Sequence, residues 1–137
     1  MTRHDVLLKV SALFGFAFGL GLGVYQTFTL DPMISTMHDG VPYWMRVTHI
    51  HILGLSLVTF VLSFVIDDAF ESHRGKVAWL TVLGQWGTPL TLYPVVALGI
   101  VVFGPIHNLV SLLTFVVVLA FAVAYARSWS QVSEPDR

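Results

Sequence analysis

The chain has 137 residues, of which 55% are hydrophobic and only 11% are charged, and its formal net charge is -1. A soluble domain carries about 25% charged residues, so this chain has too few charges to face water on all sides. The near-neutral charge offers no basic footprint for nucleic acid, and the absence of cysteine excludes disulfides, thiolate metal sites and iron–sulfur clusters. The length corresponds to one domain, so we expect residues 1–137 to form a single membrane domain.

Four uncharged stretches define the predicted elements, at residues 10–30, 47–66, 77–102 and 106–126. Each supplies about the 20 residues that are needed to cross a hydrocarbon core of about 30 Å. The first stretch is too long for the apolar core of a cleavable signal peptide. We therefore predict an all-α fold, an integral membrane four-helix bundle with helices at about 7–30, 45–67, 76–102 and 105–127.

The first predicted helix carries small residues at every fourth position, namely Ser11, Gly15, Gly19 and Gly23. Residues at this spacing line one face of a helix, and small side chains there let another backbone approach closely. We therefore predict that a second helix packs closely along this face.

The second predicted helix contains His49 and His51 within an apolar span. Ionisable residues inside a membrane are rare and usually face a protein interior or a cavity. Residues i and i+2 of a helix lie about 200° apart, so the two imidazoles point to nearly opposite sides and cannot hold one metal ion together. Either each ring hydrogen-bonds to a neighbouring helix, or the two rings serve two separate sites.

The third predicted helix contains Pro89 and Pro94, which predict a kink. Hydroxyl groups of Thr88 and Thr91 are well placed to bond the carbonyls that a kink frees. The fourth predicted helix begins near His107, which is either a metal ligand or a helix-start residue.

Lys and Arg residues predict the orientation in the membrane. One side of the predicted bundle carries Arg3, Lys9, Arg74, Lys76, Arg127 and Arg137, whereas the other carries only Arg46. Cytoplasmic loops are rich in Lys and Arg, so we expect both termini in the cytoplasm of a multi-pass protein of the cell (plasma) membrane. His38, His49, His51 and His107 then lie in the outer half, and His4 and His73 lie on the cytoplasmic side.

The run Thr48-His49-Ile50-His51-Ile52-Leu53-Gly54-Leu55-Ser56, which continues to Phe64, resembles the tenth helix of the catalytic subunit of haem–copper oxidases. In that family a His-x-His pair ligates two different haems, one on each side of the helix. The family subunit has twelve helices in three arcs of four, and the second helix of each arc supplies ligands. Nitric oxide reductases share this plan. The chain is similar to one such arc standing alone.

The resemblance implies that His49 and His51 bind the iron of b-type haem. It also implies a homotrimer, in which each haem takes His49 from one chain and His51 from the next. Electron transfer or gas-related redox chemistry, with a partner protein or a quinone, is the expected role. The copper-site histidine triplet, the crosslinked tyrosine and the paired propionate arginines of the family have no counterpart here. A single chain therefore cannot form the oxidase's active site, and the sequence assigns no catalytic residue.

The sequence is also compatible with two alternatives. The chain can be a non-catalytic accessory or structural subunit of a respiratory membrane complex, in which the histidines only donate hydrogen bonds. It can also bind copper on the outer side, through His38, His107 and one of His49 or His51. Other polar residues of the spans either line a haem pocket or, as we favour, hydrogen-bond between helices; they are Thr48, Ser56, Thr59, Gln85, Trp86, Thr88 and Tyr93.

Overall fold

The computed structural model describes residues 2–30 and 40–129 and shows an all-α protein with four long helices. The elements are α1 (Arg3–Tyr25), the short π-helix η1 (Gln26–Leu30), α2 (Tyr43–Ser63), α3 (Ile66–Ala69), α4 (Arg74–Leu98) and α5 (Phe103–Trp129). The second helix ends at Ser63 instead of near residue 67. After Ser63 the backbone N–H groups of Phe64 and Val65 bond carbonyls three residues back, which tightens the chain before the separate turn α3.

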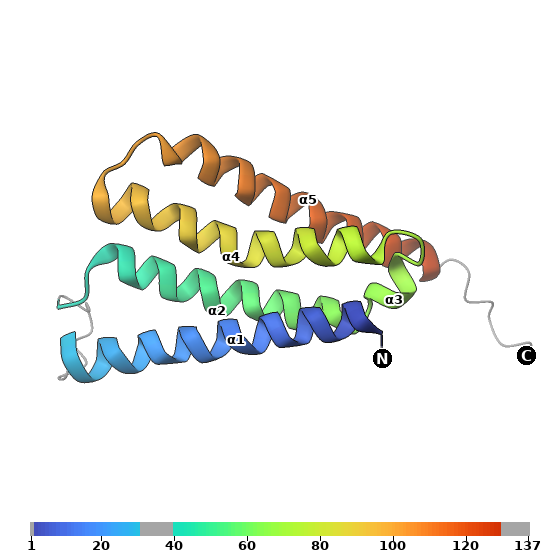
Figure 1. Cartoon of the computed structure of the whole chain (residues 1–137), viewed down its shortest axis with the longest axis horizontal. Coiled ribbons are helices and arrows are strands. Elements are labelled where there is room, and N and C mark those ends of the chain that lie inside the picture. The colour runs from blue at the N-terminus through green and yellow to red at the C-terminus, as the bar shows by residue number, and fades with distance from the viewer. Residues whose placement is uncertain (1, 31–39, 130–137) are drawn as a thin grey trace, which may run out of the picture.

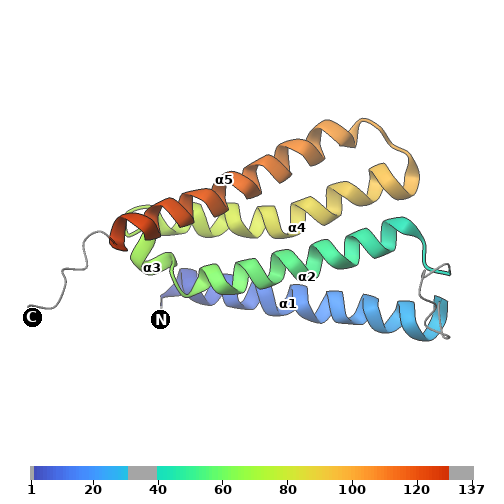
Figure 2. The same cartoon turned by 180° about the vertical axis from the view of Figure 1, so that it is seen from behind.

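The long helices form two antiparallel hairpins, α1 with α2 and α4 with α5 (Figures 1 and 2). The hairpins meet where α2 packs on α4, and α1 also contacts α4. Figure 1 shows that the start of α1 and the end of α5 lie at the same end of the bundle, beside α3. The turns from α4 to α5 and into α2 lie at the opposite end.

Close packing of α1 on α2 is confirmed, and the small residues of α1 make it possible. A Cβ atom at Gly15 would overlap Ser56 Oγ, and one at Gly19 would lie 2.5 Å from Leu53 Cδ2. Real Cβ atoms do not approach other atoms so closely, so the two backbones meet at a distance that only glycine permits.

A buried polar network joins α1, α2 and α4 near the middle of the bundle. Ser11 Oγ donates to Gln85 Oε1 at 2.8 Å, and Gln85 Nε2 donates to the Ser11 carbonyl and to Ser56 Oγ, each at 3.0 Å. Trp86 Nε1 donates to Ser11 Oγ at 3.0 Å. Ser56 and Gln85 are buried, and each polar group of the amide side chain has a partner. Ser56, Gln85 and Trp86 therefore hydrogen-bond between helices, the role that we favoured from the sequence.

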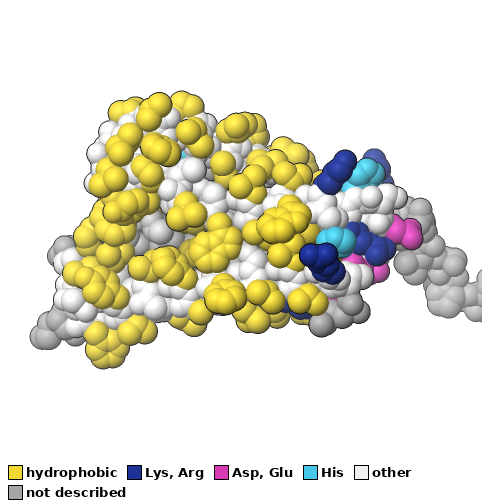
Figure 3. Space-filling model, viewed as in Figure 1, with side chains coloured by type: hydrophobic (Ala, Val, Ile, Leu, Met, Phe, Trp, Pro, Cys, Tyr) yellow, Lys and Arg dark blue, Asp and Glu magenta, His cyan; other side chains and the backbone are white. Residues whose placement is uncertain are grey.

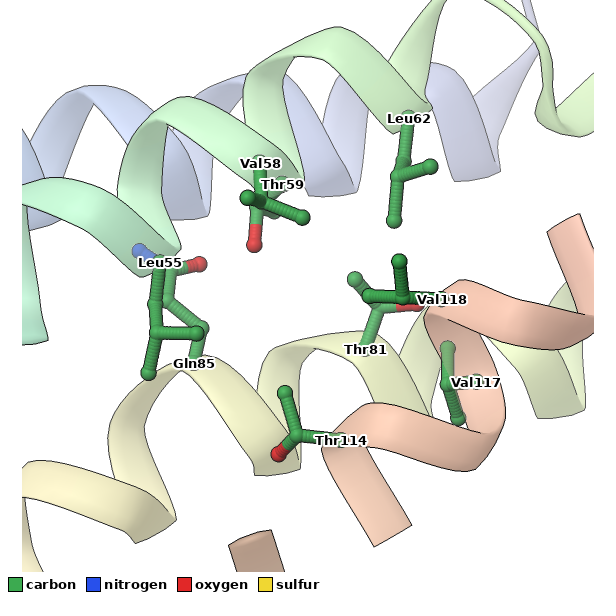
Figure 4. Close-up of a pocket in the computed structure, with 9 residues that line it drawn as sticks. All are labelled: Leu55, Val58, Thr59, Leu62, Thr81, Gln85, Thr114, Val117 and Val118. Atoms are coloured by element: carbon green, nitrogen blue, oxygen red, sulfur yellow. The ribbon is translucent and has the colours of Figure 1, made fainter. Parts of the chain in front are cut away.

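The half of the bundle that contains the chain's N-terminal end has a continuous apolar core. Its buried residues come from all five α-helices and are Leu8, Leu62, Ile66, Ala78, Val117 and Phe121. Figure 4 shows side chains of α2, α4 and α5 that converge beside this core. The space between them is only about 10 Å³, which is at the limit for one water molecule. The space that α2, α4 and α5 enclose here is packed and leaves no room for a larger ligand.

Three helices are long and apolar enough to cross a membrane: Arg3–Leu30, Tyr43–Ser63 and Phe103–Arg127. They indicate a multi-pass membrane protein. Figure 3 shows apolar side chains over most of one face, with Lys, Arg, Asp and Glu gathered at one end. The helix α4 is equally long but less apolar, because Gln85 and several Thr, Gly and Pro residues interrupt its hydrophobic run.

Candidate functional site

His49 lies in the second turn of α2 and packs against α1. A Cβ atom at Gly23 of α1 would lie 2.7 Å from His49 Cε1, so the imidazole occupies the space that this glycine leaves. Among the residues that the structure describes, His49 makes no hydrogen bond. Its position is therefore fixed by packing, and both ring nitrogens remain available to a ligand.

His51 is oriented by its own helix. Its Nδ1 lies 2.8 Å from the carbonyl oxygen of Val47, one turn earlier in α2. A carbonyl only accepts hydrogen bonds, so Nδ1 carries the proton and Nε2 of the neutral ring has the free lone pair. Metal-ligating histidines usually donate their second nitrogen to a carbonyl or carboxylate in this way, which fixes the ring and its tautomer.

The two histidines lie on different flanks of α2. The His49 flank continues to Leu53, which packs on Gly19 of α1. The His51 flank continues, one and two turns later, to Leu55 and Val58, which face α4 and α5 (Figure 4). One chain therefore cannot present both imidazoles to one metal ion.

His107 connects the start of α5 to α4. Its Nδ1 lies 3.2 Å from Thr91 Oγ1 and 3.2 Å from the carbonyl oxygen of Thr88. The carbonyl accepts, so Nδ1 is the donor and the ring is held against the part of α4 that contains the prolines. The contacts account for His107 by helix packing alone.

Thr91 bonds the backbone of α4 near its two prolines. Its hydroxyl donates to the carbonyls of Gly87 at 2.7 Å and Thr88 at 3.2 Å. Pro89 and Pro94 deprive different carbonyls, four residues before each ring, of their N–H donors. The Thr91 hydroxyl therefore does not bond the carbonyls of Gln85 and Leu90, which the prolines free. Thr88 turns its own hydroxyl toward Thr114 of α5, at 3.4 Å.

Residues 2–30 and 40–129 contain no group of three or more His, Asp or Glu side chains that are close enough to hold a metal ion. His38, the loop ligand of the predicted copper site, lies outside the described residues. Of the other residues of that site, His49 lies on the α1 side of α2, His51 on the opposite flank of α2, and His107 at the start of α5.

An apolar pocket of about 400 Å³ lies between α1, α2 and α4, in the same half of the bundle as the histidines. Aromatic rings form much of its wall, and Trp44 meets Tyr93 edge to face with 5.0 Å between ring centres. Its volume is in the range of small-molecule sites. The lining residues include Thr48, Trp86 and Tyr93, which the sequence singled out as possible pocket residues.

The donor chemistry of α2 fits haem iron. A neutral imidazole with Nδ1 bonded and Nε2 free has the lone pair that iron ligation requires, and His51 has this form. His49 lies on the other flank of α2, so one chain cannot offer both rings of the His-x-His pair to the same iron.

Residues 1–136 match the model of a family described as a domain of unknown function, DUF8059, and the chain belongs to this family. No curated protein and no solved structure matches the chain.

Proposed function

We propose that this member of the DUF8059 family crosses the cell membrane with all four of its long helices and has both termini in the cytoplasm. The helix α4 has 25 residues, which at about 1.5 Å per residue exceeds a hydrocarbon core of about 30 Å. The polar side chains that lower its hydropathy, among them Thr81, Gln85 and Thr88, are buried against other helices. The surface that α4 turns outward is therefore compatible with lipid.

The distribution of cations supports the orientation. Arg3 begins α1, Arg74 begins α4 and Arg127 is near the end of α5, all at the end of the bundle that Figure 3 shows as charged. Arg46, in the first turn of α2, belongs to the opposite end. The excess of positive charge marks the first end as cytoplasmic. His49, His51 and His107 then lie in the outer half.

Within this frame we propose that the protein binds b-type haem through His51 and His49. The observation that carries the proposal is the 2.8 Å hydrogen bond from His51 Nδ1 to the Val47 carbonyl, which leaves Nε2 as a free donor to iron. A bound haem would supply reversible one-electron chemistry, whose potential depends on its axial ligands and burial. Electron transfer or gas-related redox chemistry is the corresponding role.

A homo-oligomer, most simply a trimer, supports bis-histidine ligation. His49 and His51 face opposite flanks of α2, so each haem would take His49 from one protomer and His51 from the next. Three copies would hold three haems and would reproduce the twelve-helix plan of the oxidase subunit that α2 resembles. In a closed ring every His49 and every His51 ligates a haem, whereas an open dimer leaves one His49 and one His51 without a haem.

The absorption spectrum of the purified full-length protein, oxidised and reduced, tests the haem proposal. We expect a Soret band that is lost in His51→Ala and in His49→Ala. His73→Ala is the matched control, because His73 is exposed at the charged end, and it should keep the full band. No Soret band after haem supplementation would overturn the proposal. Full haem occupancy in His49→Ala would overturn ligation by two chains.

A second candidate is an accessory subunit of a larger membrane complex. The helix α5 favours this role. It is the most apolar of the three candidate spans, and only 11% of its most apolar segment is buried within the chain. This wide apolar face suits either lipid or a larger subunit. Copurification of a stoichiometric partner from native membranes, together with a colourless protein, would favour this role over haem binding.

A further inference from the structure

The cations at the charged end fall into two groups. Lys9 Nζ lies 2.6 Å from Asp5 Oδ1, and Arg74 Nε lies 3.8 Å from Asp67 Oδ1. Arg3, by contrast, has no ion pair within the described part of the chain. The first group is neutralised by the protein itself, whereas the charge of Arg3 is available to an anion.

Arg3 lines a pocket between the first turn of α1 and the second turn of α4. The pocket has a volume of about 280 Å³, and His4, Leu7 and Trp79 form the rest of its wall. His4 is seated over Gly75 of α4, where a Cβ atom would lie 3.2 Å from its Nε2. The close approach at Gly75 therefore brings the imidazole to the edge of α4.

Residues of α4 extend the pocket in two directions. Lys76, three residues before Trp79, lies on the same face of the helix and has no ion pair within the residues that the structure covers. Leu83, one turn beyond Trp79, is 52% exposed and continues an apolar surface away from the charged end. A cationic rim thus adjoins an apolar path along the same helix.

This combination matches the two parts of a phospholipid. The guanidinium of Arg3 presents forked N–H donors that suit phosphate oxygens, and an imidazole N–H adds another donor. Trp79 is 63% exposed, and amphipathic indole rings favour the level of lipid headgroups. Basic pockets between membrane helices on the cytoplasmic side are typical of sites for anionic headgroups.

We propose that the pocket lined by Arg3, His4, Leu7 and Trp79 binds the phosphate headgroup of an anionic phospholipid of the cytoplasmic leaflet. One acyl chain then follows Trp79 and Leu83 along α4. The continuous apolar path favours a lipid over free phosphate, which has no use for it. The inference rests on the proposed membrane orientation but not on haem binding, and the Soret band tests the latter separately.

Fluorescence quenching by brominated lipids tests this site in the full-length protein. The protein is reconstituted in phosphatidylcholine with rising fractions of brominated phosphatidylglycerol or brominated phosphatidylcholine. The difference between the natural protein and Trp79→Phe isolates the signal of Trp79. Each cation near a membrane surface favours an anionic lipid about fivefold. We therefore expect brominated phosphatidylglycerol to quench half of the Trp79 fluorescence at a several-fold lower lipid fraction than brominated phosphatidylcholine does.

Variants separate the pocket from the general charge of this end. Arg3→Gln should lower the preference about fivefold, and Arg3→Gln with Lys76→Gln should remove it. Arg3→Lys should keep most of it, which also reports that changes at residue 3 leave the fold intact. Arg127→Gln is the matched control, because Arg127 lies at the same end but outside this pocket, and it should keep the full preference.

Three results would overturn the proposal. Equal quenching by the two brominated lipids would show that the pocket does not select charge. A preference that persists in the Arg3→Gln, Lys76→Gln variant with unchanged helical content would assign the selectivity to other cations. Loss of the preference on addition of millimolar inorganic phosphate, at constant ionic strength, would identify a free-phosphate site instead.

Discussion

Substitution of Gly15 by alanine tests the packing on which the bundle depends. A Cβ atom at Gly15 would overlap Ser56 Oγ and Gln85 Nε2, both of which are buried in the polar network. Gly21, on the same helix, has no atom within 4 Å of the corresponding position. Both substitutions gain a similar helix propensity, about 1 kcal/mol, so Gly21→Ala is a matched control for Gly15→Ala.

The cost at Gly15 follows from what must move. Gln85 is 1% exposed and makes three hydrogen bonds, so it cannot turn away without losing partners. Overpacking of a core costs about 1–3 kcal/mol, and each interhelical hydrogen bond lost in a membrane protein costs about 0.6 kcal/mol. We expect Gly15→Ala to be less stable than Gly21→Ala by about 2–4 kcal/mol.

Equilibrium unfolding in mixed micelles with rising denaturing detergent, followed by far-ultraviolet circular dichroism, measures this difference. Pairing of each variant with Gln85→Leu tells whether the two positions are coupled. If Gly15→Ala is as stable as Gly21→Ala, then α1 does not approach α2 and α4 as described, and the reasoning from the glycine stripe fails.

Three further predictions concern the outer half and the orientation. Gly23→Ala should turn the His49 ring, because the added Cβ atom would lie 2.7 Å from His49 Cε1. An off-rotamer ring should weaken haem binding, measured by haem titration, about two- to tenfold. Gly54→Ala is the control, because its Cβ atom would meet no other atom, and it should leave the haem affinity unchanged. His107→Ala should lower stability by about 1 kcal/mol through its bonds to α4 but keep the Soret band, and loss of that band would make His107 a ligand. Because the chain has no cysteine, single cysteines report the topology. Ser72→Cys should react with an impermeant maleimide only in opened cells, whereas Val102→Cys should react in intact cells. The reverse pattern would show that the termini lie outside the cell.

The sequence determined the features that depend on local chemistry. Length, low charge and four uncharged runs indicated long apolar helices, because crossing a hydrocarbon core requires an uninterrupted apolar segment. The small-residue face of α1 also followed from spacing alone, since the period of a helix decides which residues share a face. The opposed directions of His49 and His51 likewise follow from the period of the helix.

Only the tertiary structure decided how polar residues distant in the chain are paired. Ser11 and Gln85 are 74 positions apart, and nothing in either neighbourhood tells that they bond each other. The same holds for His107, whose partners on α4 depend on how two hairpin helices are aligned. The sequence did not predict the pocket at Arg3, because this pocket forms only where α1 and α4 meet at Gly75. Such sites depend on helix packing, which periodicity predicts only in part, whereas the presence of each helix depends on its own residues.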